Sequence, residues 1–283
     1  MVKFYLILIC LFSFKTTTAQ RFKQAYLINE KTDKPVSFYP IRLPKNQMIY
    51  SDLNGLFYYP KNTVLEFRYP LFQYLKINSE NLGSVLYLRE RKMGLEELVI
   101  YKGESIPVNP FYKKVFKDRK GIVQTMAVGT KSELLSKVIF NEKYYNRKVK
   151  TVTFRLMNET AEYKNADSYI RLNVYNINKK LIYSSNPIKI DASKTIEVNH
   201  ELESDVFIDL IGMYFGIEII GLINQDGGFH PTGKPYLNVS MFNKNFDDYQ
   251  AEHFMHIVTD PSFYRINNPN NYRYLKIFGF DLQ

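Results

Sequence analysis

Cysteine, tryptophan and histidine are scarce in this chain, and the position of the single cysteine excludes thiol chemistry. Of the 283 residues, one is cysteine, none is tryptophan and four are histidine. Cys10 lies inside the apolar N-terminal run, so removal of that run leaves no thiol for a disulfide, a metal site or catalysis. It follows Ile9 rather than a small residue at the end of the run, which argues against a lipid anchor. The nucleotide-binding glycine loop and the Gly-x-Ser-x-Gly elbow are also missing.

Long apolar runs are limited to the N-terminus. Lys3 precedes the apolar residues 4–14, and small residues follow at 17–19, which is the layout of a secretory signal peptide over residues 1–19. A transmembrane helix needs about 20 apolar residues, roughly twice this run. We therefore expect residues 20–283 to be exported to the periplasm or the outer membrane, with no transmembrane segment left after cleavage.

Acidic residues are outnumbered by basic ones. Lysine and arginine total 38 against 28 acids, and loss of Lys3 and Lys15 lowers the formal charge from +10 to +8. A basic balance suits nucleic acid, acidic polymers or a membrane surface. Because the chain is expected to be exported, nucleic acid is an unsuitable partner, and lipopolysaccharide or acidic glycans are more suitable ones. The other interpretation is that the basic side chains only solvate the outer faces of strands. The basic residues 113–120 have the same two interpretations.

Short alternating runs separated by turns favour β-structure throughout. In the first part, residues 64–69 and 84–89 alternate between apolar and polar side chains, and polar turn residues bound both runs. This pattern predicts a small antiparallel sandwich over residues 20–90. Residues 91–125, with prolines and a charge run, predict a basic linker that contains one strand, at 95–101.

The remaining residues, 126–283, predict a second, larger sandwich. Residues 131–137 suggest a brief helical turn. The strands are expected at 122–129, 137–140, 149–156, 169–175, 195–198, 214–220, 236–241 and 275–280. So many strands favour a jelly roll. The predicted fold class is all-β, a small transthyretin-like β-sandwich followed by a larger jelly-roll-like β-sandwich.

The first part also resembles a known family. Its motifs are the Asp-Leu-Asn-Gly turn at 52–55 with the aromatic run after it, the polar turn at 29–35 and the Leu-Glu-Glu-Leu-Val-Ile-Tyr strand at 95–101. They resemble the carboxypeptidase-regulatory-like domain of Bacteroidetes-type envelope proteins, over residues 20–101. The resemblance implies a non-catalytic module in the cell envelope, of the kind that precedes TonB-dependent receptors.

The second part has a resemblance of its own. Residues 138–154, and the path from 170–177 to 215–219, resemble domains that follow the regulatory-like module in short Bacteroidetes proteins. Their shape is similar to carbohydrate-binding jelly rolls. That comparison is one of fold and identifies no site.

Two pairs of residues that contain histidine have the spacing of metal ligands. His200 and Glu203 match the His-x-x-Glu pair of zinc carboxypeptidases, whose chemistry also needs a third ligand and a general base. In those enzymes the pair belongs to a large α/β domain, whereas here it follows a strand-like run. We therefore expect a partly buried histidine at a strand end and reject peptidase activity. His253 and His256 point to opposite faces on a strand and to one face on a helix, where a surface metal site is conceivable. We favour the strand and expect no metal and no cofactor.

The richest loop is 225–235, between two strong strands. Loops on rigid sandwiches often carry binding residues. We therefore expect either a polar-aromatic ligand-binding rim or an ordinary hairpin. The rim residues are Asp226, His230, Lys234, Asp247 and Tyr249. Asp226, Asp247 or Asp248 would be the oxygen ligands of any calcium ion.

These features predict an exported envelope protein that is not an enzyme. Its expected role is binding or scaffolding, with TonB-dependent uptake as the associated process. The expected partner is an envelope protein such as a TonB-dependent receptor, or a glycan or lipopolysaccharide. The alternatives are a carbohydrate-binding module and a metal-dependent hydrolase.

Overall fold

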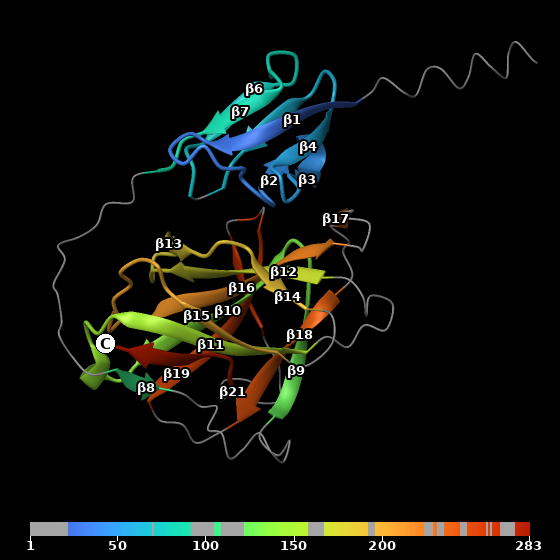
Figure 1. Ribbon diagram of the computed structural model, residues 1–283. Helices are drawn as coiled ribbons and strands as arrows, with labels where there is room; N and C mark the ends of the chain where they lie inside the picture. The colour runs from blue at the N-terminus through green and yellow to red at the C-terminus, as the bar shows by residue number, and fades with distance from the viewer. Residues whose placement is uncertain are drawn as a thin grey trace, which may run out of the picture. The chain divides into compact units, whose positions relative to one another are not determined.

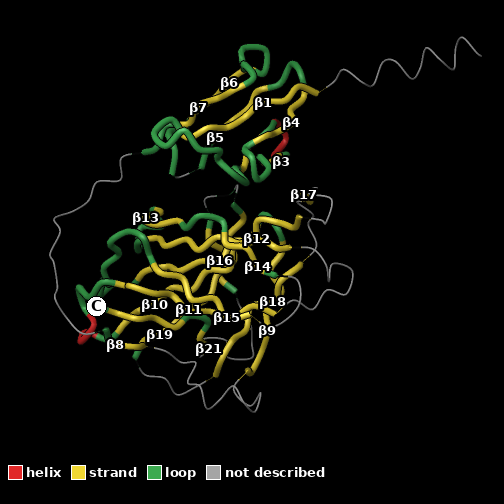
Figure 2. Tube along the Cα trace, in the orientation of Figure 1, coloured by secondary structure: helices red, strands yellow, loops and turns green. Residues whose placement is uncertain are grey.

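Strands make up nearly all the regular structure of this protein. The computed structural model describes residues 22–69, 71–91, 105–108, 122–157, 167–191, 196–223, 229–230, 235–243, 248–258, 260, 262–266 and 275–283. Within these ranges the only helical elements are two 3₁₀ turns, Pro44–Asn46 and Glu142–Tyr144 (Figure 2). The prediction of an all-β sandwich protein is confirmed.

The chain divides into two compact units, Met1–Lys92 and Met93–Gln283. This division lies close to the boundary expected at residue 90. Each unit has its own cluster of buried apolar side chains, the first around Leu27 and Phe57 and the second around Phe215 and Phe280.

The first unit is built from two small sheets (Figure 1). Its strands are β1 Phe22–Asn29, β2 Pro40–Arg42, β3 Met48–Tyr50, β4 Leu56–Pro60, β5 Val64–Phe67, β6 Leu75–Asn78 and β7 Val85–Leu88. One sheet has the order β4-β1-β7 and the other β3-β2-β5-β6. Apolar side chains from both sheets form the core, as in a sandwich. The expected antiparallel pattern has one exception, because β1 and β7 pair in parallel.

The turn predicted at residues 52–55 is present and well defined. The Asp52 carboxylate accepts hydrogen bonds from the backbone N–H groups of Asn54 and Leu56, each at 2.8 Å. Gly55 has a φ of +76°, and a Cβ there would lie 2.5 Å from the Leu27 carbonyl oxygen. Glycine is required at this position because it alone meets both the backbone angle and the close approach.

The second unit is a larger two-sheet sandwich. Its strands are β8 Ile106–Val108, β9 Ile122–Gly129, β10 Ser132–Phe140, β11 Val149–Met157, β12 Asp167–Tyr175, β13 Leu181–Ser184, β14 Ile188–Ile190, β15 Ile196–Glu201, β16 Met213–Ile223, β17 Phe229–His230, β18 Pro235–Asn243, β19 Tyr249–Ile257, β20 Phe263–Arg265, β21 Leu275–Lys276 and β22 Gly279–Leu282. One sheet runs β13-β12-β16-β10-β19-β20, with β14 and β17 attached, and the other β21-β18-β11-β22-β8, with β15 and β9 attached. The core lies between them.

Two local predictions were wrong. The helical turn expected at 131–137 is instead the start of β10, which pairs with strands on both sides, so tertiary pairing overrides local propensity there. Part of the expected linker belongs to the second unit, since β8 pairs with β22 and Val108 is fully buried. Pro107 is compatible with β8 because that strand ends the sheet, where a missing N–H leaves no ladder bond unmade. The strand expected at 95–101 lies outside the described residues.

Candidate functional site

The outer face of the β4-β1-β7 sheet is the most unusual surface of the first unit. Alternate residues of β1 and β4, such as Leu27 and Phe57, point into the core and are fully buried. The intervening residues face outward, and several are large and apolar. We call these outward side chains the aromatic strip. They are Phe22, Tyr26, Tyr58, Val85 and Tyr87, with exposed fractions of 65%, 40%, 58%, 41% and 55%.

The register of the strands makes the strip continuous. Tyr26 lies opposite Leu56 on one side and Val85 on the other, and Tyr58 lies opposite Gln24. The outward positions of the three strands are Phe22, Gln24, Tyr26, Ile28, Leu56, Tyr58, Pro60, Val85 and Tyr87. None of these residues is charged, although the solvent face of an antiparallel sheet is normally polar.

Charged residues lie at one end of the strip. The next outward residues after Ile28 and Tyr87 are Glu30 and Arg89, whose side chains form a two-point ion pair with N–O distances of 2.5 and 2.8 Å. The hydrogen bond from Arg89 lowers the pKa of Glu30, so the pair stays ionised. The two charges neutralise each other and mark the border of the strip.

An open depression lies at the other end of the strip. Its volume is about 410 Å³, and Phe22, Lys23, Gln24, Tyr58, Tyr59, Leu82, Gly83 and Ser84 line it. Aromatic rings therefore stand beside the Gln24 amide and the Ser84 hydroxyl, with Lys23 as the one charged lining residue. Apolar and aromatic walls with a few polar groups are typical of small-molecule sites.

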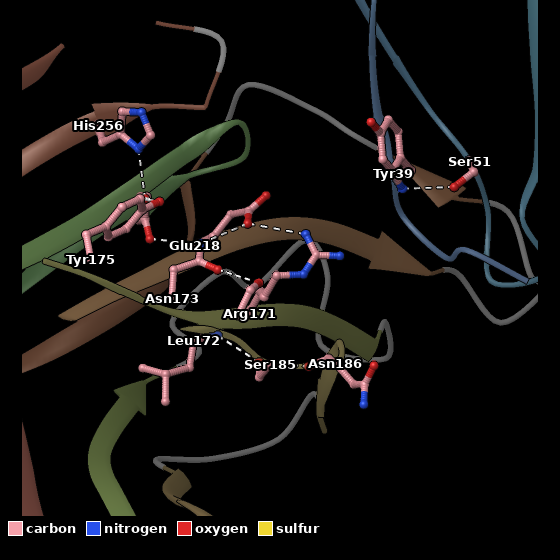
Figure 3. Close-up of polar contacts among 12 residues, drawn as sticks. Tyr39, Ser51, Arg171, Leu172, Asn173, Tyr175, Ser185, Asn186, Glu218 and His256 are labelled. Carbon is pink, nitrogen blue, oxygen red and sulfur yellow. Dashed lines mark hydrogen bonds and ion pairs between the residues drawn. The ribbon is translucent and has the colours of Figure 1, made fainter. Parts of the chain in front are cut away.

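The second unit contains a different feature, a charged row on the face of its larger sheet that points away from the core. His256, Glu133, Glu218 and Arg171 lie directly opposite one another on β19, β10, β16 and β12. Figure 3 shows Arg171 beside Glu218, with His256 at the far end of the row. All four residues are buried, from 0% exposure for Glu133 to 9% for His256. Charges are rarely buried without partners, so their hydrogen bonds decide what the row can do.

Glu133 is the centre of the row. Its Oε1 accepts a hydrogen bond from Asn173 Nδ2 at 2.9 Å, and its Oε2 lies 2.8 Å from both the Tyr175 hydroxyl and His256 Nδ1. Gly216 makes room for this carboxylate, since a Cβ there would lie 2.1 Å from Oε1. Both oxygens of Glu133 are therefore engaged, which fits a structural anchor across the strands better than a general base.

Asn173 joins the two acids of the row. Its side-chain amide also reaches Glu218 Oε2, at 3.3 Å, and Arg171 Nη1 lies 3.3 Å from the same oxygen. Aromatic rings cover the network, since Phe263 packs against Tyr175 at 5.3 Å and against His256 at 4.9 Å between ring centroids. The row is thus shielded from water on its outer side.

Burial and charge oppose each other at His256. Burial lowers its pKa, but the hydrogen bond to Glu133 and the negative charges of Glu133 and Glu218 outweigh this effect, so the pKa is raised. In its protonated form, His256 lies against the Glu133 carboxylate, as Arg171 lies against that of Glu218.

Of the predicted rim residues, Tyr249 is the one whose side chain the structure describes. Tyr249 is 1% exposed, and its hydroxyl donates a hydrogen bond to the Phe278 carbonyl, so it is a core residue and not part of a rim. The local sequence, an aromatic residue beside a polar loop, did not indicate that the Tyr249 side chain points into the core. His230 lies on β17, paired with Leu222, and nothing is described of its side chain. Asp226, Lys234 and Asp247 lie outside the described residues.

The other histidines occupy positions expected of strand residues. His253 faces the core side of β19, with Ser136 Oγ at 2.9 Å and the Leu275 carbonyl at 3.1 Å, whereas His256 faces the opposite side. His200 lies 2.6 Å from the Tyr183 hydroxyl, and burial lowers its pKa. Asp248, a candidate calcium ligand, accepts hydrogen bonds from Lys143 and Tyr144. Across the described ranges, no three His, Cys, Asp or Glu side chains are grouped to hold a metal ion.

Comparison with known proteins adds no relative. No protein-family model, curated protein or solved structure matches the chain. Among the residues with described positions, no helix is long and apolar enough to span a membrane.

Sequence reasoning missed the aromatic strip, although a signal was available. In residues 56–59, apolar or aromatic side chains occupy both faces of the strand, whereas a half-exposed strand normally alternates.

Proposed function

We propose that this chain is a non-catalytic, exported protein of the cell envelope that binds or scaffolds other envelope components through the aromatic strip. The carrying observation is the continuous, uncharged and exposed face formed by Phe22, Tyr26, Tyr58, Val85 and Tyr87. Leaving apolar area in water costs about 25 cal/mol per Å². Contiguous exposed apolar patches of this kind mark interaction sites, because a partner recovers that free energy.

Two further observations support the proposal. The signal-like N-terminus favours export, and the resemblance of residues 20–101 to a receptor-associated module favours an envelope setting beside TonB-dependent uptake. The charged row takes no part in the proposed role, because both Glu133 oxygens already have donors. Tyrosine is also enriched in the binding surfaces of proteins generally, where its ring packs and its hydroxyl remains hydrated.

The test is a pull-down of the tagged protein from cross-linked envelopes of its own organism, with bound molecules identified by mass spectrometry. A variant with Tyr58→Ala and Tyr87→Ala is compared with Tyr145→Ala, whose side chain is equally exposed, at 57%, but lies in the second unit. We expect specific partners to be lost with the double variant and kept with the control. Partners retained by the double variant would overturn the assignment of the strip as the contact surface.

A further inference from the structure

We infer that the aromatic strip binds an uncharged polysaccharide chain, whose sugar rings stack on Tyr26, Tyr58 and Tyr87. This inference rests on the proposed function and names the ligand class for the same surface. Three features of the strip carry it: the absence of charge, the size of the face, and the mixture of flat rings with hydrogen-bonding groups.

The absence of charge on the strip distinguishes neutral ligands from anionic ones. The chain as a whole is strongly basic, with a formal charge of +10, yet none of the outward positions on β4, β1 and β7 carries a charge. A surface for phosphate or an acidic sugar would present arginine or lysine side chains to it. The ion pair at the border of the strip, Glu30 with Arg89, is internally neutralised. Charge complementarity therefore favours a neutral ligand over lipopolysaccharide phosphates or an acidic glycan.

The area of the strip favours a sugar chain over a folded protein as the ligand. Strands spaced by about 4.8 Å, with about 3.3 Å per residue, give this face a width of roughly 15 Å and a length of roughly 25 Å once side chains are included. That is on the order of 400 Å², whereas a stable protein interface covers about 800 Å² on each partner. A narrow face with an ion pair at one end suits a single extended chain better than a folded partner.

The chemistry of the side chains fits sugar rings. Each pyranose has a face of C–H groups that packs on an aromatic ring, while its hydroxyls need hydrogen-bonding partners. Along one strand the outward side chains recur about every 6.6 Å, a spacing that places rings and the Gln24 amide alternately along β1. Gln24, Ser84 and the cationic Lys23 line the depression together with Phe22 and Tyr58, so hydrogen-bonding groups accompany the rings there.

The experiment is isothermal titration of the purified protein with soluble starch, laminarin and mannan as neutral polymers, and with alginate as an anionic one. We expect binding to at least one neutral polymer, with an affinity that is the same at low and high salt because no charges are screened. The triple variant Tyr26→Ala, Tyr58→Ala and Tyr87→Ala should weaken it by about tenfold or more. Tyr145→Ala should leave the affinity within about twofold.

Each other outcome overturns the inference, and the pull-down separates it from the proposed function. If the triple variant binds a neutral polymer as tightly as the wild type does, the strip is not the sugar-binding site. Binding to alginate alone, lost at high salt, replaces a neutral ligand by an acidic one. If no neutral polymer binds while envelope proteins are still captured in a strip-dependent way, the ligand class is wrong and the proposed function stands. If neither occurs, both fail. Because all three tyrosines are exposed, unchanged thermal unfolding of the triple variant shows that it remains folded.

Discussion

His253 and His256 lie on the same strand, but their surroundings shift their protonation in opposite directions. His253 faces the core, and burial lowers its pKa to about 4. His256 faces the charged row, where Glu133 and Glu218 raise its pKa in spite of burial. Since alternate faces of β19 provide such different environments, the pH dependence of stability has two separable contributions.

Replacement of His253 should reduce the loss of unfolding free energy that the protein undergoes as the pH falls below about 6.5. The folded pKa of about 4 lies below the unfolded value of about 6.5, so the unfolded chain binds the proton more tightly. Stability should therefore fall by about 3 kcal/mol as the pH drops from about 6.5 to about 4. Urea unfolding of the wild type and of His253→Gln over this range measures the effect. Equal pH dependence in both proteins would contradict it.

His256 should contribute with the opposite sign. Its folded pKa lies above the unfolded value, so its stabilising contribution is complete below about pH 6.5 and is lost as the pH rises through the raised value. The charged groups that face it are Glu133 and Glu218, and Asp260 contributes its carbonyl. We expect the stability difference between the wild type and His256→Gln to shrink as the pH rises above about 6.5. NMR titration of the imidazole gives the pKa directly, and an unshifted value would contradict the expectation.

At the scale of elements, the close pairing of β10 and β16 depends on Gly216. A Cβ at this position would lie 2.1 Å from Glu133 Oε1 and 2.6 Å from Leu135 Cδ2. The Glu133 carboxylate cannot move aside without losing its hydrogen bonds to Asn173, Tyr175 and His256. A buried charged group left without partners costs at least about 2 kcal/mol.

We therefore expect Gly216→Ala to destabilise the second unit by about 2 kcal/mol or more, measured by urea unfolding. The matched control is Gly83→Ala, because a Cβ there has as its nearest neighbour the Val85 carbonyl oxygen at 3.9 Å. That control should change the free energy of unfolding by less than about 0.5 kcal/mol. A Gly216→Ala variant as stable as the control would show that the Glu133 carboxylate relocates freely.

Local pattern was enough to predict strands such as β11 and β16, but not what their faces contact. The alternation in residues 149–156 and the turn at 52–55 depend on neighbours in sequence, and the structure contains both elements. β10 was misjudged because Leu134 and Leu135 are both buried, one on each face of a sheet, which erases the alternation. The charged row joins four strands that are far apart in sequence, so only the register could reveal it.

The candidate site shows the same limit. Tyr249 and Tyr58 are both tyrosines in strands beside polar turns, yet one is 1% and the other 58% exposed. Which face of a strand is covered depends on a second sheet that the local sequence does not specify. The aromatic strip therefore became visible only when the pairing of β4, β1 and β7 was known.

At the scale of the whole molecule, the two units should unfold as separate cooperative blocks. They divide between Lys92 and Met93, and each has its own core. Domains with separate cores generally fold independently. A variant confined to one unit should then shift one transition and leave the other in place, as expected for distant, uncoupled sites.

Gly55→Ala and Gly216→Ala form the matching pair for this test. Gly55 has a φ of +76°, and its added Cβ would lie 2.5 Å from the backbone oxygen of Leu27, so the substitution should cost the first unit about 2 kcal/mol or more. In calorimetry of the whole protein, Gly55→Ala should lower the midpoint of one transition and Gly216→Ala that of the other, and the double variant should lower each midpoint by the same amount as the corresponding single variant. One transition that both variants shift together would show that the units are energetically coupled. Any ligand that binds the aromatic strip should then raise only the midpoint that Gly55→Ala lowers, because binding stabilises the unit that carries the site.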